Sequence, residues 1–454
     1  MNYENINQKI LELKEDIIAS VQESVRINSI KSEAEEGAPY GKGCKAALEN
    51  ALKLGEKLGF RTGNVGNRVG YVEYGEGEEM VAVLGHLDVV PLGEGWTVEP
   101  FAANIIDGKI YGRGVQDDKA ATIGAIYGLK AIRDLGLKLD RRIRVLFGTD
   151  EECGSSCVHY YIDNGEELPV MGFTPDASYP LIFCEKGMHG VTIGKKEVDP
   201  GEGEVISFGG GVASNVVTPN CKLVVKGELN VPEAEGVKVT IENGITTIVA
   251  EGAGAHGSTP EKGINAAIRL FQAVKDIRFT GDFQKMVNFV LNNLVGETNG
   301  ETLGIRYFDA ETGETTVNLG VLNYDGKTMT FTLDIRYPQN AVPEEVTKNV
   351  TAAAEKEGLD ILRCAVTPVL YVPKDSELVQ KLCKVFKEHS GMDLEPLAIG
   401  GGTYAKAFKN MVAFGPGFPG KEYGCHEADE CVEIDEMIKS CQIVTSAMYE
   451  MAQK

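Results

Sequence analysis

Two short apolar runs, each leading directly into charged residues, are the feature that most restricts how this chain can fold. Met80–Leu84 is followed by Gly85-His86-Leu87-Asp88, and Ile143–Phe147 leads into Thr149-Asp150-Glu151-Glu152. A helical pattern from Ala120 to Leu135 separates the two runs, so the order is strand, helix, strand. In a parallel sheet covered by helices, sites form at the carboxyl ends of the strands. The polar residues after these two strands are therefore the first candidates for chemistry.

The pattern of apolar residues divides the chain into an outer and an inner part. Helical patterns occupy residues 6–25 and 44–58 near the start, and residues 378–389 and 434–451 near the end, with a short strand at 411–414 between the last two. From 187 to 373 the sequence pattern changes to that of short strands with alternating apolar residues and Gly-rich turns, with a helix predicted at 264–277.

We therefore expect an α/β catalytic domain made of residues 1–186 and 374–454, with a mixed, mostly parallel sheet and helices on both faces. Residues 187–373 are expected to form an inserted α+β domain. Two domains also suit the length, because 454 residues exceed the size at which one hydrophobic core stops growing.

The acidic composition excludes some partners. Lys and Arg number 45 against 67 Asp and Glu, a formal charge of -22 that would repel the phosphates of nucleic acid and of anionic membranes. The N-terminal residues show no basic stretch followed by an apolar run, and no apolar segment is long enough to cross a bilayer, which predicts a cytoplasmic location. The ten cysteines lack paired metal-ligand spacing, and we expect most of them to be reduced and buried.

His86 and Asp88 have the spacing of a metal ligand and its partner. A histidine ligand needs its second ring nitrogen held, and a carboxylate two residues away can accept that N–H and fix the tautomer. A histidine beside a turn with no metal fits the same two residues.

Asp117 lies in the loop Gly112-Arg113-Gly114-Val115-Gln116-Asp117, directly before the helix that begins at Ala120. A helix N-cap is one interpretation of such an Asp, although Asp118 is better placed for it. The other is a carboxylate that bridges two cations, because two-metal hydrolytic sites hold their ions about 3.5–4 Å apart.

Glu151 and Glu152 are adjacent acids, and neighbouring side chains do not easily point to the same spot. One can bind a metal while the other takes a proton from the attacking water, although a solvated acidic loop is the simpler interpretation. Asp176, in Thr174-Pro175-Asp176-Ala177, and His426, in Gly424-Cys425-His426, could complete a ligand set. Alone, each is more often a turn Asp or a surface His.

In order along the chain, these segments resemble the M20 metallopeptidases of the aminoacylase and carnosinase type, and within them the PepV-like dipeptidases. The H-x-D, the G-R-G-x-x-D loop, the E-E pair, the P-D-A segment and the late G-x-H-x-x-D-E occur in the family's order over nearly the whole chain. The resemblance implies two divalent ions, zinc first, with manganese or cobalt as alternatives.

The family pattern also implies a role for each residue of the set. Asp117 would bridge both ions, His86 and Asp176 would complete one, and Glu152 and His426 the other. Glu151 would be the general base, and Asp88 would support His86.

The inserted domain resembles the lid of this family. His256, in Gly254-Ala255-His256-Gly257, matches the lid histidine that donates to the oxyanion of the tetrahedral intermediate. Arg336, in Asp334-Ile335-Arg336, matches the lid arginine that pairs with a substrate carboxylate, although a cross-strand salt bridge is an alternative. Asn215 is similar to a substrate-contacting Asn of the PepV-like members.

The glycine run Gly400-Gly401-Gly402-Thr403 lacks the Lys-Ser or Lys-Thr of a phosphate loop. The resemblance instead places the backbone of Gly401 and Gly402 and the hydroxyl of Thr403 near the substrate's carboxylate. A plain turn between a strand and a helix is the alternative.

The resemblance implies hydrolysis of dipeptides or short peptides with a free carboxylate by a hydroxide that bridges two ions. A deacylase of N-acyl amino acids on the same scaffold is the nearest alternative, because both reactions cleave an amide next to a carboxylate. A non-catalytic peptide-binding protein is a third, against which the complete ligand set and Glu151 argue. The long lid resembles that of the PepV-like members, which predicts a monomer acting on small peptides.

Overall fold

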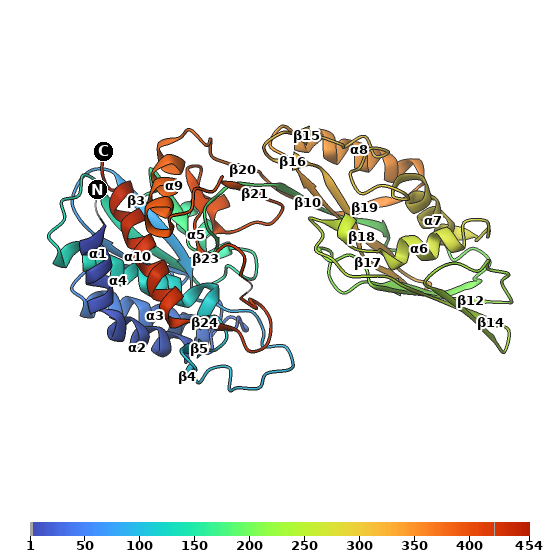
Figure 1. Cartoon of the computed structure of the whole chain (residues 1–454). Helices are drawn as coiled ribbons and strands as arrows, with labels where there is room; N and C mark the ends of the chain where they lie inside the picture. Colours follow the sequence, from blue (N-terminus) through green and yellow to red (C-terminus); the bar gives the residue numbers. More distant parts are fainter. Residues whose placement is uncertain (1–2, 422) are drawn as a thin grey trace. The chain divides into compact units, whose positions relative to one another are not determined.

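A computed structural model describes residues 3–421 and 423–454 of the chain (Figure 1). The chain divides into two compact units: unit 1 comprises residues 1–184, 370–397 and 402–454, and unit 2 comprises residues 185–369 and 398–401. The domain limits expected from the sequence were residues 187 and 373. Residues 398–401, which the sequence assigns to the first domain, belong to unit 2 instead.

Unit 1 is built on a mixed sheet whose centre is parallel. Its main path of strands is β1-β2-β6-β3-β7-β22-β9-β20, and a further strand, β21 (Leu397–Ile399), pairs with β9 off this path. The pairs β6-β3, β3-β7 and β7-β22 are parallel, whereas β1-β2, β2-β6 and β22-β9 are antiparallel. The strands are β1 (Arg61–Val65), β2 (Val69–Tyr74), β3 (Met80–His86), β6 (Arg142–Gly148), β7 (Met171–Thr174), β9 (Ile182–Glu185), β20 (Leu370–Tyr371) and β22 (Met411–Ala413).

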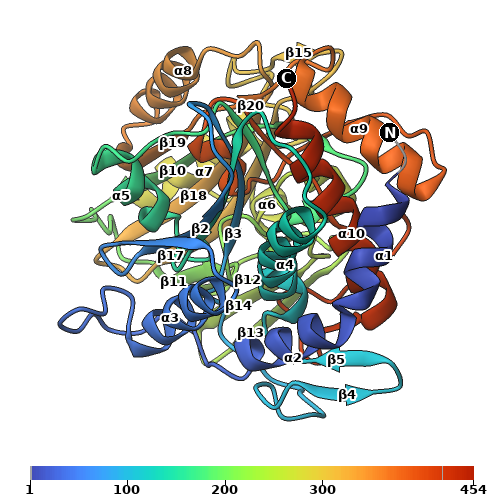
Figure 2. The same cartoon turned by 90° about the vertical axis from the view of Figure 1, so that its left-hand side faces the viewer.

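Helices cover both faces of this sheet. Figure 2 shows α5 on one side of β2 and β3, and α4 and α10 on the other. The mixed α/β class with helices on both faces, which the sequence predicts, is confirmed. The helices of unit 1 are α1 (Glu4–Glu12), α2 (Lys14–Val25), α3 (Lys42–Lys57), α4 (Ala120–Asp134), α5 (Ser156–Asp163), α9 (Glu377–Ser390) and α10 (Ile434–Met451).

The first helix expected from the sequence is two helices. Leu13, with ψ near 0°, ends α1 and precedes α2, so one continuous helix over residues 6–25 is wrong. The break lets each piece turn its own apolar side inward: Ile6 and Ile10 are buried in α1, Ile17 and Val21 in α2. Within the described part of the chain, no helix joins the length and the apolar character needed to cross a membrane.

Three parallel strands end at one edge of the sheet and place candidate site residues there. Every residue of β3 is buried, which suits a strand covered on both faces. His86 is the last residue of β3, Glu151 follows the end of β6 by three residues, and Asp176 follows the end of β7 by two. Because the carboxyl ends of parallel strands meet at the same edge, these three side chains come together although they are far apart in sequence.

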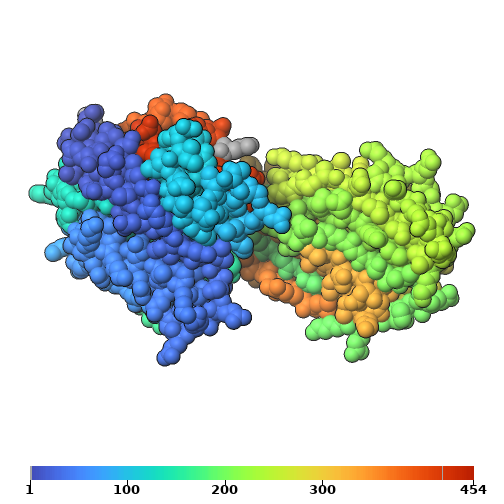
Figure 3. Space-filling model, turned by 90° about the horizontal axis from the view of Figure 1, so that it is seen from below, coloured from blue at the N-terminus to red at the C-terminus, as the bar shows by residue number. Residues whose placement is uncertain are grey.

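Smaller elements surround that edge. The hairpin of β4 (Asn104–Ile106) and β5 (Lys109–Tyr111) pairs with β24 (Cys431–Glu433), and the cyan segment in Figure 3 that contains the hairpin lies at the surface of unit 1. The two-residue strands β8 (Ala177–Ser178) and β23 (Pro416–Gly417) pair in parallel beyond Asp176.

Unit 2 is an antiparallel sheet with helices packed on it. The order is β13-β14-β12-β11-β17-β18-β10-β19, and Figure 1 shows α6, α7 and α8 over this sheet. A cluster of phenylalanines that includes Phe208, Phe271 and Phe283 forms the core between them. The elements are β10 (Gly187–Lys195), β11 (Val205–Gly210), β12 (Asn220–Lys226), β13 (Val237–Glu242), β14 (Ile245–Glu251), β17 (Thr316–Tyr324), β18 (Met329–Tyr337), β19 (Asp360–Thr367), α6 (Ala266–Ala273), α7 (Gly281–Asn293) and α8 (Pro343–Lys356).

A glycine on α4 allows this helix to pack closely against α10. A Cβ added at Gly124 would lie 2.5 Å from the Sγ of Cys441 on α10. Gly→Ala in a helix ordinarily stabilises by up to about 1 kcal/mol, but here we expect Gly124→Ala to lower the free energy of unfolding by about 1–3 kcal/mol through overpacking. Urea unfolding followed by the fluorescence of Trp96, the single tryptophan, reports on unit 1. In a Cys441→Ala background the same substitution should be tolerated, and an equal loss there would contradict this account.

Burial of His389 makes the stability of unit 1 depend on pH. The ring stacks on Tyr3 and its Nε2 lies 2.9 Å from Ser446 Oγ, and burial lowers the pKa of His389 to about 4. The unfolded chain, with an ordinary pKa near 6.5, binds the proton more readily, so stability is lost as pH falls from about 6.5 toward 4. Between pH 7 and pH 5 we expect a loss of about 1–2 kcal/mol that is absent in His389→Gln. Urea unfolding of the wild type and of His389→Gln at both pH values tests this. Equal losses in the two proteins would refute the assignment of the pH dependence to His389.

Candidate metal centre and active site

The candidate ligands of unit 1 come from strand ends and from two loops. His86 ends β3, whereas Asp117 lies in the short π-helical turn η1 (Val115–Lys119) that precedes α4. Asp117 itself departs from helical geometry (φ -125°, ψ 90°), and the Asp117–Asp118 peptide bond is cis. His426 lies in the turn before β24 with φ at 67°, a conformation that is uncommon for a residue other than glycine. A positive φ like that of His426, outside glycine, is found preferentially at functional sites.

The carboxylate of Asp117 lies between two histidines, with one oxygen toward each. Its Oδ1 is 2.9 Å from His86 Nε2, and its Oδ2 is 3.0 Å from His426 Nε2. The His86 side chain is fully buried, whereas 56% of the His426 side chain is exposed. The two histidines therefore approach the same carboxylate from an inner and an outer position.

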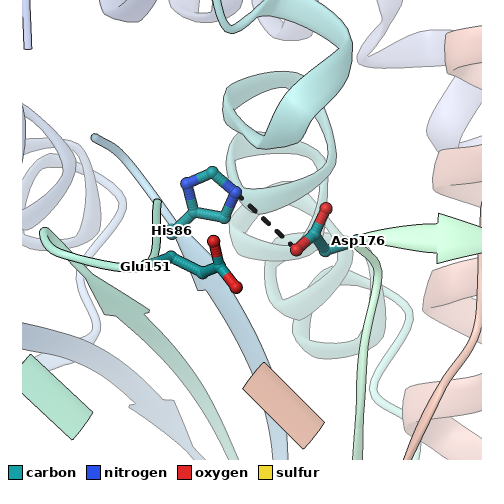
Figure 4. A group of neighbouring side chains, drawn as sticks. All are labelled: His86, Glu151 and Asp176. Carbon is teal, nitrogen blue, oxygen red and sulfur yellow. Dashed lines mark ion pairs between the residues drawn. The ribbon is translucent and has the colours of Figure 1, made fainter. Parts of the chain in front are cut away.

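Each histidine has a second carboxylate beside it. His86 Nε2 lies 3.8 Å from Asp176 Oδ2, the contact drawn in Figure 4, and His426 Nε2 lies 3.3 Å from Glu152 Oε1. Among the described residues, this buried Oε1 accepts no hydrogen bond of good geometry. The donors thus fall into two sets that share Asp117, one with His86 and Asp176 and one with His426 and Glu152.

The concentration of carboxylates dominates the electrostatics. Burial and the neighbouring charge on Asp117 raise the pKa of Asp176 well above its ordinary value. The hydrogen bond that His426 donates to Asp117, together with the adjacent Glu152 carboxylate, raises the pKa of His426 to about 10. Burial opposes protonation of His86, but its bond to Asp117 and the charge on Asp176 still raise its pKa well above the usual range. The carboxylates thus favour positive charge at the positions of both histidines.

Glu151 lies next to the inner set. Its carboxylate, the Nε2 or Nδ1 of His86 and the carboxylate of Asp176 offer ligand atoms within 4.8 Å of one another, and all three side chains face a common space in Figure 4. Burial raises the pKa of Glu151 to about 7. A carboxylate that titrates near neutrality is suited to accept a proton from water and to return it.

Asp88 has a different contact from the one its spacing suggests. The backbone carbonyl of Asp88, not its carboxylate, lies 3.0 Å from His86 Nδ1, and Oδ1 is 3.7 Å from that nitrogen. The buried carboxylate instead accepts the backbone N–H groups of Glu151 and Glu152, each at 3.1 Å. The prediction that the Asp88 carboxylate accepts the N–H of the His86 ring is therefore wrong. The loop after β6 supplies two backbone N–H donors to this carboxylate instead.

In unit 2 the tautomer of His256 is defined by its neighbour. Its Nδ1 accepts the backbone N–H of Ser258 at 3.2 Å and lies 2.7 Å from the Ser258 hydroxyl. Burial and the charge of Arg336 lower the pKa of His256. The neutral ring must then carry its proton on Nε2, which leaves that N–H free to donate.

Arg336 is held by Asp334 within unit 2. Asp334 accepts from Arg336 Nε at 2.9 Å and from NH2 at 2.8 Å, and NH1 donates to the Gly400 carbonyl at 3.1 Å. A salt bridge is thus present, as the alternative interpretation expects, although it joins two residues of the same strand. Both Asn215, whose carbonyl accepts the N–H of Gly257 at 2.6 Å, and Gly401 lie in unit 2.

The glycine run crosses the limit between the two units. Gly402 and Thr403 belong to unit 1. The Thr403 hydroxyl accepts the N–H of Ala405 at 3.2 Å and caps the 3-10 helix η3 (Tyr404–Ala407). This is the turn geometry of the alternative interpretation.

Some residues were missed or misjudged from the sequence. Arg113 and Glu430 occur in the quoted motifs without a role, yet both are buried around the Asp117 loop. The sequence contained a signal for them: an Arg and a Glu that lie in two different motifs, each with a candidate ligand, are candidates for a mutual ion pair. None of the ten cysteines forms a disulfide, but only five are buried rather than most of them, and Cys153, beside Glu152, is exposed.

The comparisons with known proteins agree with this geometry. Residues 82–450 match the model of peptidase family M20/M25/M40. The chain belongs to this family. A Bacillus subtilis (strain 168) protein named "Putative dipeptidase YtjP" is 37% identical over 470 aligned residues that cover 100% of both chains.

Solved structures share the fold at low sequence identity. Human carnosine dipeptidase 1 has a TM-score of 0.62 and 16% identity, covering 100% of this chain and 99% of that one. The B. subtilis YXEP protein, described as a dinuclear metal binding peptidase from the M20 family, has a TM-score of 0.53 and 11% identity, covering 96% and 98%. The M20 family, the fold class and the peptidase activity predicted from the sequence are confirmed.

The Asp88 carboxylate should matter through the two glutamates that it positions. Asp88→Asn replaces one acceptor oxygen by an NH2 group, which leaves one of the two buried N–H groups without a partner. We expect the free energy of unfolding to fall by about 1–3 kcal/mol, together with a drop in peptidase activity. Asp107→Asn, in the exposed β4–β5 turn, is the control and should change stability by less than about 0.5 kcal/mol. Urea unfolding measures the free energy of unfolding of both variants. Equal values for Asp88→Asn and Asp107→Asn would refute the contact between the Asp88 carboxylate and the two N–H groups.

Proposed function

We propose that this M20 peptidase binds two divalent metal ions in unit 1 and uses them to hydrolyse dipeptides. The observation that carries the proposal is the division of the Asp117 carboxylate, with Oδ1 toward His86 and Oδ2 toward His426. A carboxylate in this arrangement can bridge two cations, as two-metal hydrolytic sites require. His86 and Asp176 would complete one ion, and His426 and Glu152 the other.

The donor set fits such ions. Imidazole nitrogens and carboxylate oxygens suit zinc, manganese and cobalt, with zinc our first choice. The buried Glu152 Oε1 that accepts no well-formed hydrogen bond is a natural ligand atom. The raised pKa values of His86 and His426 point the same way, because protons occupy positions where the carboxylates favour positive charge. The description of the YXEP protein as dinuclear gives further support.

Glu151 is the general base of the proposed reaction. When bound, the metal ions would polarise the scissile carbonyl and acidify the attacking water. Glu151 takes the proton of that water and returns it to the leaving amine, a cycle for which a pKa near 7 is suited. Asp88 holds the loop of Glu151 and Glu152 through its two backbone hydrogen bonds.

We propose that groups of unit 2, together with Gly402 and Thr403 of unit 1, recognise the substrate. His256, neutral and protonated on Nε2, donates to the developing oxyanion. Arg336 would contribute positive charge for the substrate's free carboxylate, with Asn215, Gly401, Gly402 and Thr403 as further contacts. The printed names of YtjP and of carnosine dipeptidase 1 favour dipeptides over acylated amino acids. We further propose that the protein acts as a monomer in the cytoplasm.

The test is hydrolysis of a dipeptide panel by protein stripped of metal and then supplied with zinc or manganese. Activity should require metal, and Glu151→Gln should lower kcat by about 10²–10⁴-fold because the base is lost. The variant's metal content must equal that of the wild type, so that the loss reports on proton transfer.

Substrate class is decided in the same assay. A dipeptide should be cleaved far faster than its N-acetylated form. The reverse preference would establish the deacylase alternative, and full activity in Glu151→Gln would overturn the assigned mechanism.

A further inference from the structure

A buried ion pair outside the proposed ligand set links the two loops that carry Asp117 and His426. Arg113 NH1 lies 2.8 Å from Glu430 Oε2, and both side chains are 1% exposed. Arg113 precedes Asp117 by four residues, and Glu430 follows His426 by four. The pair therefore belongs to both loops at once.

The Glu430 carboxylate binds the backbone of the Asp117 loop directly. Its Oε2 accepts the N–H of Gly114 at 2.9 Å. Its Oε1 accepts the N–H of Gln116 at 2.9 Å and that of Asp117 itself at 3.3 Å. Gly114, with φ at 79°, adopts the left-handed conformation that lets these N–H groups converge on one anion. The main-chain position of Asp117 thus depends on one carboxylate.

The Arg113 guanidinium extends the same contact to the His426 turn. NH1 donates to the Glu427 carbonyl at 3.1 Å, next to His426. NH2 donates to the Leu92 carbonyl at 3.1 Å, and the guanidinium lies 5.1 Å from the centre of the Trp96 ring. A planar fork spreads its donors over several atoms and can reach carbonyls that the single ammonium nitrogen of a lysine cannot contact together.

Stability alone does not explain this pair. Removing two charges from water is costly, and replacing a buried ion pair by apolar residues is often neutral or stabilising. What the pair achieves here is geometric, because every hydrogen bond just described fixes a loop that carries a proposed ligand. Outer partners of this kind commonly affect metal affinity by about 10–100-fold.

We propose that Glu430, held by Arg113, is a positioning residue that places the Asp117 carboxylate between His86 and His426 and thereby sets the affinity for both metal ions. The inference rests on the proposed two-metal function. Because Asp117 is shared by the two donor sets, a displaced Asp117 loop weakens both sites together.

The experiment measures binding of Mn²⁺, and separately of Zn²⁺, to the full chain stripped of metal, by calorimetry or by competition with a chelator. Glu430→Gln keeps the size of the side chain but places an NH2 group against backbone N–H donors. We expect its affinity for both ions to fall by about 10–100-fold. KM for a dipeptide should stay within about twofold and kcat should fall at limiting metal, because no substrate contact changes.

Glu427→Gln is the matched control. It removes the same charge from the same turn at an exposed side chain, so it should bind metal with wild-type affinity. The unfolding temperature of the metal-free proteins, with Trp96 fluorescence as a local reporter, separates positioning from mere stability. A lower unfolding temperature with unchanged metal affinity in Glu430→Gln would overturn the proposal.

Arg113→Lys provides a second measurement if Glu430→Gln does not fold. It keeps the positive charge beside Glu430 but cannot reach the carbonyls of Leu92 and Glu427 together, so weaker metal binding supports the proposal and wild-type affinity overturns it. Absence of metal binding by the wild-type protein would instead overturn the proposed function itself. The two failures are thus told apart by the wild-type measurement.

Discussion

The accumulation of negative charge at one edge of the unit 1 sheet is the constraint on which the rest of the site depends. Asp117, Asp176, Glu151 and Glu152 lie around His86 and His426, largely withdrawn from water. Carboxylates in such surroundings must be protonated, paired or bound to cations. Asp176 and Glu151 respond by a raised pKa, and the two histidines by holding protons. Bound divalent ions would replace all of these protons. The cluster of carboxylates, which costs free energy when the charges are uncompensated, is therefore suited to metal ions.

The parallel centre of the sheet is what makes this accumulation possible. β3, β6 and β7 run side by side in the same direction, so that residues separated by tens of positions reach one edge. The strands place His86 firmly, because its strand is buried along its whole length. Asp117 and His426 have no such support, since they lie on loops. Their loops are held instead by the Glu430 carboxylate, which accepts the backbone N–H groups of Gln116 and Asp117, and by Arg113, which donates to the Glu427 carbonyl.

The parts of the structure that could be predicted are those encoded in local pattern. The buried runs that became β3 and β6, and the helical period that became α4, α9 and α10, are visible because burial on two faces or on one stripe leaves a periodic trace. The candidate ligands could be collected because each follows such an element or a glycine-flanked loop. Hydrogen-bond partners leave no such trace. The Asp88 carboxylate binds the N–H groups of Glu151 and Glu152, 63 and 64 residues away, and no spacing rule distinguishes this from a bond to His86. The break at Leu13 was invisible for the opposite reason, since the apolar period continues through it.

The role proposed for His256 suits its electrostatic surroundings in unit 2. Within the carboxylate cluster, the hydrogen bond to Asp117 and the adjacent Glu152 raise the pKa of His426 to about 10. A histidine that donates to an oxyanion can do so as a neutral ring, provided that the ring nitrogen that carries the proton is defined. In unit 2, burial and Arg336 lower the pKa of His256, and the Ser258 N–H bound to Nδ1 directs the ring proton to Nε2. The same residue type can thus serve both proposed purposes, because carboxylates surround His426 whereas burial and Arg336 lower the pKa of His256.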